Sequence, residues 1–307
     1  MRTAGTARGE DVRMRVGVQL PEVERVVRWP ELARMARAVE AGGFDSIWVG
    51  DHYLYDLHGQ RVGPWEAWTT LAALAAVTER VRLAPFVASL TFHNPAVIAK
   101  MAATVDEVSS GRLILGVGAG WNETEYRAFG FPFERRVARF AESFDVVRRL
   151  VGGETVSLDG EFVQLDRCVL HPPSARPQPI PILIGSTGPR MLDIALPHAA
   201  AWNAWFNEYD NLPSEVGRAL APLRAACERI GRDPATVETS VALLMDFGAE
   251  RPRQHSINPV RGPVAVQAEA LHTLAAAGVD LVQLVLDPIT ERSIEQAAEV
   301  VAVFRAG

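Results

Sequence analysis

The chain has 307 residues, of which 48% are hydrophobic, and its formal net charge is −6. This composition is sufficient for one large core, and α/β barrels of about 250 residues or more commonly fold as a single unit. The acidic balance argues against a nucleic-acid or anionic-membrane partner, and no apolar stretch reaches the roughly 18 residues that span a bilayer. We therefore expect the partner to be a small molecule.

Residues 1–13 are polar and lack the apolar segment of a signal peptide. We expect them to form a flexible extension, followed by a single barrel domain over residues 14–307. The two cysteines, Cys168 and Cys227, have neither metal-ligand spacing nor the pattern of a disulfide framework. Together these features favour a cytoplasmic protein, and no metal site is expected.

Eight short runs rich in Val, Ile and Leu alternate with eight segments of helical periodicity, which predicts eight βα units. The expected strands lie near residues 15–20, 44–50, 81–87, 113–117, 180–185, 199–203, 237–246 and 279–286. The expected helices cover residues 31–41, 67–77, 95–108, 136–151, 187–196, 213–230, 264–276 and 293–304. Because the alternation continues to the C-terminus without a second zone of composition, a (β/α)₈ TIM barrel fits better than an open doubly wound sheet.

Residues 155–181 interrupt this alternation. Two short apolar runs, at 156–158 and 162–165, flank a turn at Asp159-Gly160 and predict a β-hairpin outside the barrel. A proline-rich segment then leads to the fifth expected strand. The predicted barrel therefore carries a short hairpin excursion between its fourth and fifth strands.

Active sites of such barrels form at the carboxyl ends of the strands. Asp51 and His52 follow the second expected strand directly. A histidine can donate or accept a proton near neutral pH, and an adjacent aspartate can fix its tautomer or hold a cofactor group. A pair that only anchors the loop through hydrogen bonds to the backbone remains the alternative.

Glycine-rich turns follow the fourth and fifth expected strands. In the first, Gly116–Gly120, the missing side chains would let the backbone approach a flat or anionic ligand. A dinucleotide-binding fingerprint would instead stand at the first βα turn. The second, Gly185–Gly188, precedes Arg190 and has the composition of a phosphate-binding turn. For each segment, an ordinary tight or capped turn is the alternative.

Other residues near the strand ends are less specific. His93, in the loop after the third strand, is expected to pack or to cap. Trp121, Trp202 and Trp205 stand near predicted strand ends, where they could border a ring-shaped ligand or belong to the core. No His-x-His motif ends the first strand, and Lys100, the only lysine, lies within the third helix. A metal-dependent amidohydrolase and a Schiff-base aldolase are therefore disfavoured.

Five segments, in this order, resemble the luciferase-like monooxygenase superfamily, and most closely its branch of coenzyme F420-dependent oxidoreductases. They are residues 14–21 (MRVGVQLP), 46–52 (SIWVGDH), 92–100 (FHNPAVIAK), 111–123 (GRLILGVGAGWNE) and 182–190 (ILIGSTGPR). Each segment is weak alone, but the resemblance extends from Met14 to Phe304. It implies a (β/α)₈ barrel that binds a deazaflavin or flavin cofactor.

The resemblance also implies roles for particular residues. His52 would be the catalytic residue, and Asp51 would contact the deazaflavin ring. A bulge in the third strand would lie behind the ring and contain a cis peptide bond that does not precede a proline. The residues implied to contact the cofactor in the bulge and the two turns are Phe86, Val87, Ala88, Gly118, Ala119, Gly185, Ser186, Thr187 and Gly188.

The implied function is hydride transfer between coenzyme F420 and a small organic substrate. The sugar-phosphate dehydrogenases of this branch carry a catalytic glutamate directly after their glycine turn, where this chain has Trp121. A sugar phosphate is therefore not expected. The alternatives are an FMN-dependent monooxygenase that uses molecular oxygen, a non-catalytic flavin-binding relative, and a phosphate-binding barrel isomerase without a redox cofactor. Many family members are dimers, so a homodimer is expected.

Overall fold

The computed structural model describes residues 13–57, 59–174, 176–248 and 258–307. Of the extension expected over residues 1–13, all but Arg13 lies outside the described residues. No helix in these ranges is both long and apolar enough to cross a membrane.

Nine strands within the described residues form one sheet, in the order β5-β2-β1-β13-β12-β11-β10-β7-β6. They are β1 (Arg15–Gln19), β2 (Ser46–Val49), β5 (Arg82–Pro85), β6 (Ala88–Ser89), β7 (Leu115–Gly118), β10 (Ile182–Gly185), β11 (Ala201–Ala204), β12 (Glu238–Asp246) and β13 (Leu281–Asp287). Each pairs in parallel with its neighbours. The strand interiors are buried, as expected for a parallel sheet covered by helices.

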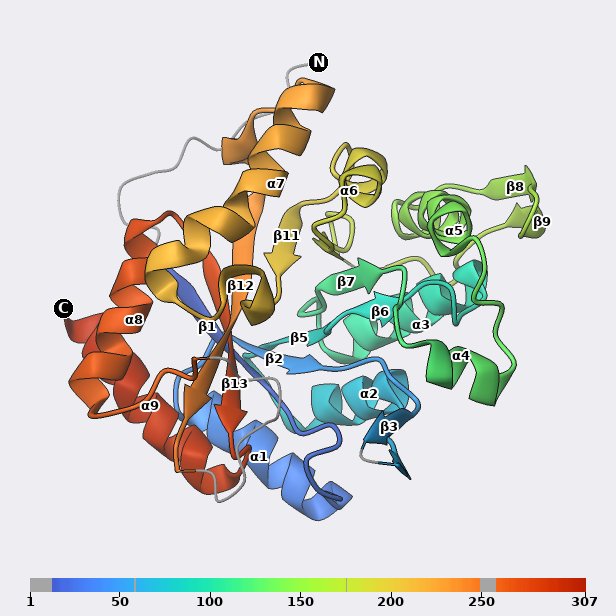
Figure 1. Cartoon of the computed structure of the whole chain (residues 1–307). Helices are drawn as coiled ribbons and strands as arrows, with labels where there is room; N and C mark the ends of the chain where they lie inside the picture. The colour runs from blue at the N-terminus through green and yellow to red at the C-terminus, as the bar shows by residue number, and fades with distance from the viewer. Residues whose placement is uncertain (1–12, 58, 175, 249–257) are drawn as a thin grey trace.

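The sheet closes at the third strand position. Two short strands, β5 and β6, follow each other along the chain and together occupy this position. β5 pairs with β2, and β6 pairs with β7. A parallel bridge between Leu83 and Leu113 joins the two edges. The eight predicted strand positions and the (β/α)₈ barrel are thereby confirmed (Figure 1).

Helices surround the barrel (Figure 1). They are α1 (Trp29–Ala41), α2 (Ala67–Val77), α3 (Pro95–Val108), α4 (Glu123–Phe129), α5 (Arg136–Val151), α6 (Pro189–Ala195), α7 (Val216–Ile230), α8 (Val264–Ala276) and α9 (Glu291–Ala306). α3 shows how local sequence sets a boundary, because the Asn94 side chain accepts hydrogen bonds from the amides of Ala96 and Val97 and Pro95 opens the helix.

The bounds of four helices differ from the predictions, and two elements were not predicted. α1 begins at Trp29 rather than at residue 31, and α9 covers Glu291–Ala306 rather than residues 293–304. α6 begins at Pro189 rather than at residue 187, and α7 begins at Val216 because residues 213–215 form a 3₁₀ turn. The sequence analysis missed α4 and a small antiparallel hairpin formed by β3 (Tyr55–Leu57) and β4 (Gln60–Val62). Both lie in the βα segments that follow barrel strands, where functional residues are expected.

The predicted hairpin excursion is present. β8 (Val156–Asp159) and β9 (Gln164–Cys168) pair in antiparallel fashion, and they lie beyond α5 at the periphery of the molecule in Figure 1. Val156 and Val163 are buried in a small apolar cluster that also contains Val146 and Leu150 of α5. The hairpin is therefore anchored to the helix layer and leaves the carboxyl ends of the barrel strands uncovered.

Candidate active site

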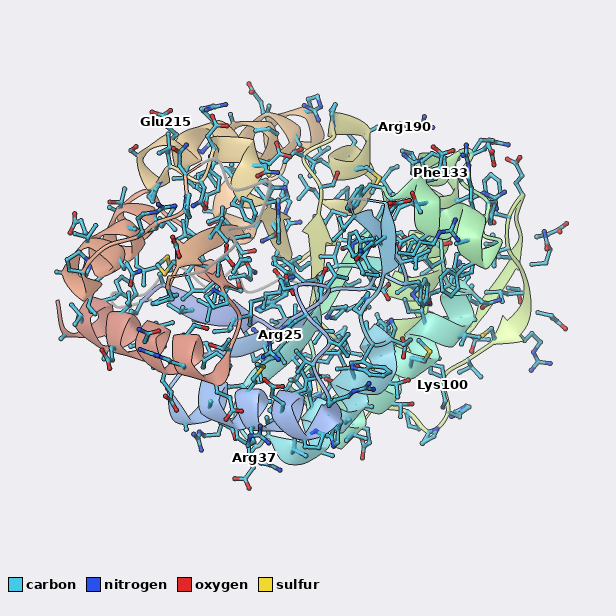
Figure 2. The ribbon with its side chains drawn as sticks, turned by 60° about the horizontal axis from the view of Figure 1, so that its bottom comes forward. Arg25, Arg37, Lys100, Phe133, Arg190 and Glu215 are labelled. Carbon is cyan, nitrogen blue, oxygen red and sulfur yellow. The ribbon has the colours of Figure 1, made fainter. Side chains whose placement is uncertain are left out.

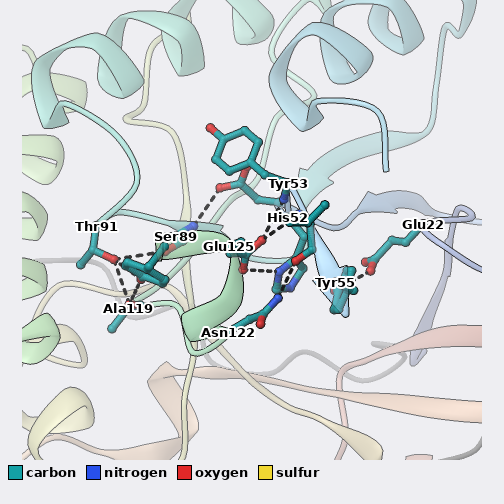
Figure 3. Close-up of polar contacts among 12 residues, drawn as sticks. Glu22, His52, Tyr53, Tyr55, Ser89, Thr91, Ala119, Asn122 and Glu125 are labelled. Carbon is teal, nitrogen blue, oxygen red and sulfur yellow. Dashed lines mark hydrogen bonds and ion pairs between the residues drawn. The ribbon is translucent and has the colours of Figure 1, made fainter. Parts of the chain in front are cut away.

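His52 lies at the carboxyl end of β2 and contacts a buried carboxylate (Figure 3). Its Nδ1 atom is 2.8 Å from Oε1 of Glu125, and the Glu125 side chain is 0% exposed whereas that of His52 is 14% exposed. Oε2 of Glu125 accepts a hydrogen bond of 2.8 Å from the Tyr53 amide. Glu125 therefore fixes both the imidazole and the loop that carries it.

This geometry determines which ring nitrogen can exchange a proton with a ligand. An ionised carboxylate only accepts hydrogen bonds, so Nδ1 carries the proton that faces Glu125. Nε2 is then the nitrogen available to a substrate. Burial alone would lower the pKa of His52, but the hydrogen bond to Glu125 and the charges of Glu22, Glu125 and Asp51 outweigh burial and raise it. The histidine is thus suited to hold a proton near neutral pH.

Asp51 is fully buried, and only one of its two carboxylate oxygens has hydrogen-bond partners. Its Oδ2 accepts hydrogen bonds of 2.9 Å from the Ser89 amide and 2.9 Å from Nε2 of His93. Its Oδ1 has no hydrogen-bond partner. His93 thus positions a carboxylate of the site, which corrects the expectation that it only packs or caps. A buried carboxylate oxygen without a donor is costly unless a bound group supplies one.

A second carboxylate approaches His52 from the end of β1. Glu22 accepts hydrogen bonds of 2.7 Å from Nε2 of Gln19 and 3.0 Å from the Tyr55 hydroxyl. The Tyr55 ring lies 4.7 Å from the His52 ring, between centroids. A side chain at Gly50 would overlap the Glu22 carboxylate, so the glycine before Asp51 makes room for it. Burial and the charge of Glu22 raise the pKa of Tyr55 well above its ordinary value.

The three tryptophans have different environments. Trp121 is 65% exposed, and its ring lies 5.7 Å from that of His52 and 6.3 Å from that of Tyr55. Trp202 is fully buried and donates a hydrogen bond to the Ser186 carbonyl. Trp205 packs against Phe86 at 5.5 Å. Of the three, Trp121 is the one that presents an open aromatic surface beside His52.

The third strand contains the expected bulge. The peptide bond between Phe86 and Val87 is cis, as the resemblance implies. Packing within the protein favours glycine at positions 118 and 185, because a Cβ on Gly118 or Gly185 would lie 2.9 Å from a Val87 methyl group. The half-buried Val87 thus fills space between the turns after β7 and β10. The sequence analysis offered ligand approach or an ordinary turn as the reason for these glycines and missed the contact with Val87.

The turn from Gly185 to Gly188 is organised by its own side chains. The Ser186 hydroxyl accepts a hydrogen bond of 3.2 Å from the Gly188 amide. The Thr187 hydroxyl lies 3.4 Å from a carboxylate oxygen of Glu208, to which it donates. The Thr187 O–H is therefore engaged, whereas Ser186 only accepts; the Ser186 O–H, the backbone and Arg190 are the groups of this segment left for an anion.

A hollow of about 620 Å³ lies beside this turn. Figure 2 labels two of its lining residues, Phe133 and Arg190, which lie close together. Arg136 stacks over the Phe133 ring at 3.8 Å, and Phe133 packs on Tyr126 at 5.1 Å. The Tyr126 hydroxyl donates to the Ala119 carbonyl at 2.9 Å. Phe133 and Tyr126 thus connect the hollow to the first glycine turn. Three of the residues that line the hollow are arginines, the third being Arg135, and Glu134 is an acidic lining residue.

Comparison with known proteins identifies the family. The sequence model described as luciferase-like monooxygenase matches residues 12–251. The chain belongs to the luciferase-like monooxygenase family. Among the described residues, no cluster of three or more His, Cys, Asp or Glu side chains could hold a metal ion.

Relatives in this family share about a third of the sequence. A phthiodiolone/phenolphthiodiolone dimycocerosates ketoreductase of Mycobacterium sp. (strain JLS) is 32% identical over 250 residues, covering 75% of this chain and 63% of the relative. An F420-dependent glucose-6-phosphate dehydrogenase of Nakamurella multipartita is 32% identical over 231 residues, covering 73% and 65%. The chain thus spans less than two thirds of the length of either relative.

The fold is shared with solved structures of luciferase-like enzymes. The coenzyme F420-dependent tetrahydromethanopterin reductase from Methanopyrus kandleri superimposes with a TM-score of 0.76 at 19% identity, covering 95% of this chain and 99% of that chain. At this identity the similarity establishes the barrel fold alone.

Sequence reasoning identified Asp51 and His52 but missed Glu22, Tyr55 and Glu125. Glu125 is separated from His52 by 73 positions, and no local pattern connects them. A usable signal was the segment from Asn122 to Glu125, because a residue that can cap a helix followed by acidic residues is typical of a helix start. Recognising α4 would have placed Glu125 in its first turn, next to the glycine turn.

Proposed function

We propose that this luciferase-like protein transfers a hydride between coenzyme F420 and a small organic substrate, with His52 as the catalytic acid–base residue. When bound, the deazaflavin supplies the two-electron chemistry, since it accepts a hydride from a substrate carbon or returns one. The observation that carries the proposal is the buried His52–Glu125 pair beside Asp51, whose Oδ1 lacks a partner.

His52 would handle the proton that accompanies the hydride. Its Nε2 accepts this proton from the substrate in the oxidative direction and returns it in the reductive direction. Glu125 stabilises the protonated imidazole from the opposite side, at 2.8 Å from Nδ1. Because Glu125 also accepts the Tyr53 amide, the histidine loop stays in place in both protonation states.

The residues around Asp51 fit a flavin-like ring. The unpartnered Oδ1 of Asp51 requires a donor, and the pyrimidine end of a flavin or deazaflavin offers an N–H group. Phe86, Val87 and Ala88 would support the ring from behind, with the Val87 methyl groups held between Gly118 and Gly185. No role in proton transfer is assigned to Asp51, because it is already engaged by His93 and Ser89.

The arginine-lined hollow favours coenzyme F420 over FMN. FMN ends at its phosphate, whereas coenzyme F420 continues beyond the phosphate into a chain of carboxylates. The backbone at Gly118-Ala119 would contact the start of this tail, and the segment from Gly185 to Gly188 with Arg190 would bind the phosphate. The hollow beside that segment then offers arginines to the carboxylates that follow. The name of the F420-dependent relative from Nakamurella multipartita supports the same cofactor.

The proposal is tested by titrating the purified apoprotein with coenzyme F420 and with FMN, side by side. We expect thermal stabilisation and a change in cofactor fluorescence that saturate with coenzyme F420 and not with FMN. Saturation with FMN alone would move the protein to the oxygen-using monooxygenases. A response to neither compound would overturn the proposed function and would favour an isomerase or a non-catalytic protein.

We also propose that the protein acts as a homodimer in the cytoplasm. The proposed dimer rests on the resemblance to a family in which many members are dimers, and not on an observed contact surface. Light scattering of the purified protein at several concentrations tests the assembly, and a mass of one chain throughout would refute the dimer.

A further inference from the structure

The charged side chains around His52 are carboxylates. Among the described residues, the charges that act on His52 belong to Glu22, Glu125 and Asp51. Those that act on the neighbouring Tyr55 belong to Glu22 and Glu125. Even with His52 protonated, the sum of these four formal charges is negative. A second anion placed at this site would meet repulsion from these carboxylates.

Glu125 holds His52 directly, whereas Glu22 is hydrogen-bonded to other residues. Its two oxygens are held by Gln19 and Tyr55, at 2.7 and 3.0 Å. Gly50 leaves the space that the carboxylate occupies at the end of β2. The charge of Glu22 is therefore fixed beside the catalytic histidine, at the end of the barrel where a substrate must arrive.

The open surface next to His52 is aromatic. Trp121 is 65% exposed and stands edge-on to the His52 ring, with the half-buried Tyr55 ring close to both. An exposed tryptophan beside a catalytic group offers an apolar face to a ligand. Three arginines, Arg135, Arg136 and Arg190, line the hollow beside α6, which the cofactor tail would occupy.

We infer that the substrate is an uncharged ketone or secondary alcohol with an apolar body, and that Glu22 is a specificity-determining residue that disfavours phosphorylated and carboxylated substrates. The inference rests on the proposed function and names its substrate class. In the oxidative direction, the carbinol carbon loses a hydride to the oxidised deazaflavin and the hydroxyl loses its proton to Nε2 of His52. The alcohol is thereby oxidised to the ketone, and reduction reverses each transfer.

The test begins with cofactor binding, measured by fluorescence polarisation of coenzyme F420. The enzyme loaded with oxidised cofactor is then titrated calorimetrically with three ketones of similar shape: cyclohexanone, 4-oxocyclohexanecarboxylate and the methyl ester of the latter. No hydride can pass to these ketones from the oxidised cofactor, so binding is measured without turnover. Steady-state kcat/KM with the reduced cofactor and the same ketones is the second measurement.

We expect cyclohexanone and the ester to bind, and the carboxylate to bind about tenfold more weakly or worse, as like charges dictate. Glu22→Gln should narrow the difference between the dissociation constants of the ester and of the carboxylate. Glu123→Gln, which removes a carboxylate exposed on α4 and paired with Arg127, should leave the difference as in the wild type. Because the ester and the carboxylate differ in charge, comparing their binding to the wild-type protein already tests the effect of substrate charge. The test therefore remains informative even if the Glu22 variant does not fold.

Equal or tighter binding of the carboxylate, or a difference that Glu22→Gln leaves unchanged, would overturn the role of Glu22. Failure of all three ketones to bind a protein that binds coenzyme F420 would overturn the substrate class while leaving the cofactor assignment intact. Failure to bind coenzyme F420 would overturn the proposed function, and this inference with it.

Discussion

Two regions of the barrel mouth differ in charge and in construction. Around His52, carboxylates are buried and held by fixed hydrogen bonds, as the 0% exposure of Glu125 shows. Beside α6, arginines line an open hollow, and Arg190 is exposed. The hydrogen-bonded carboxylates of the first region hold the groups around His52 in fixed positions. The arginines of the second region attract anions over a longer distance.

This difference explains how an anionic cofactor would enter in one orientation. A ligand with a neutral ring and a polyanionic tail gains from arginines at one end and is repelled by carboxylates at the other. Exposed arginines contribute modestly and depend on salt, whereas the buried groups around His52 set the position of reacting atoms to a fraction of an ångström. Substitutions in the two regions should therefore have effects of different size and kind.

The largest effect is expected for His52→Gln. Loss of a positioned acid–base group lowers kcat by about 10²–10⁴-fold, while the affinity for coenzyme F420 should stay within a few-fold because other residues bind the cofactor. Stopped-flow kinetics of cofactor reduction and fluorescence titration measure the two quantities. His93→Gln is the matched control, since it keeps His52 and should lower kcat less. Undiminished turnover in His52→Gln would remove the catalytic role of this residue.

A smaller effect is expected for Gly185→Ala. The new Cβ would lie 2.9 Å from both Val87 methyl groups, and overpacking of this kind costs about 1–3 kcal/mol of folding stability. Shortening the neighbour in the double variant Gly185→Ala/Val87→Ala should recover most of that loss, because the two positions are coupled. Urea unfolding of the four proteins of this cycle gives the coupling. Additive losses would show that the glycine serves the ligand rather than Val87.

A few-fold effect is expected for Arg190→Gln. Removing one exposed charge costs about 0.2–1 kcal/mol, so the dissociation constant of coenzyme F420 should rise by up to about fivefold at low salt. The rise should shrink as salt increases. The deazaflavin fragment without phosphate and tail should bind the variant and the wild type equally. If Arg190→Gln weakens the fragment as much as the whole cofactor, Arg190 does not act on the tail.

The sequence predicted the parts of the molecule in which local pattern and final position coincide. α3 matches its predicted bounds because Asn94 and Pro95 mark its start chemically. β3 and β4 escaped detection because each has three residues and little apolar alternation. Position after a strand was enough to single out Asp51 and His52, since barrel topology brings all strand ends together.

The partners of those residues could not be predicted from the sequence in the same way. Glu125 pairs with His52 across 73 positions, and His93 reaches Asp51 across 42. The packing of Val87 against Gly118 and Gly185 depends on three different strands. Such contacts follow from the closure of the barrel and leave no periodic trace along the chain.

Glu125 accepts hydrogen bonds on both of its carboxylate oxygens, from His52 on one and from the Tyr53 amide on the other. In Glu125→Gln the amide oxygen can still accept from Nδ1 of His52, but the NH₂ group cannot accept from the Tyr53 amide, and the charge that supports protonated His52 is lost. With that support gone, burial, which lowers the pKa of His52, is opposed only by the charges of Glu22 and Asp51, so the pKa should fall. The maximal rate should change little, because the imidazole remains in place, whereas its titration should move to lower pH.

The two reaction directions depend on pH in opposite senses, but both profiles should shift to lower pH in Glu125→Gln, and this combination identifies His52. Ketone reduction requires protonated His52, so its kcat/KM should fall as pH rises through the pKa, and in Glu125→Gln this fall should begin at lower pH. Alcohol oxidation requires neutral His52, so its kcat/KM should rise with pH, and in Glu125→Gln this rise should also begin at lower pH. Any stability gained from the His52–Glu125 ion pair follows the first pattern, being present at low pH and lost as pH rises through the raised pKa. If both rate profiles move to higher pH, or only one moves, the titrating group is not the His52–Glu125 pair.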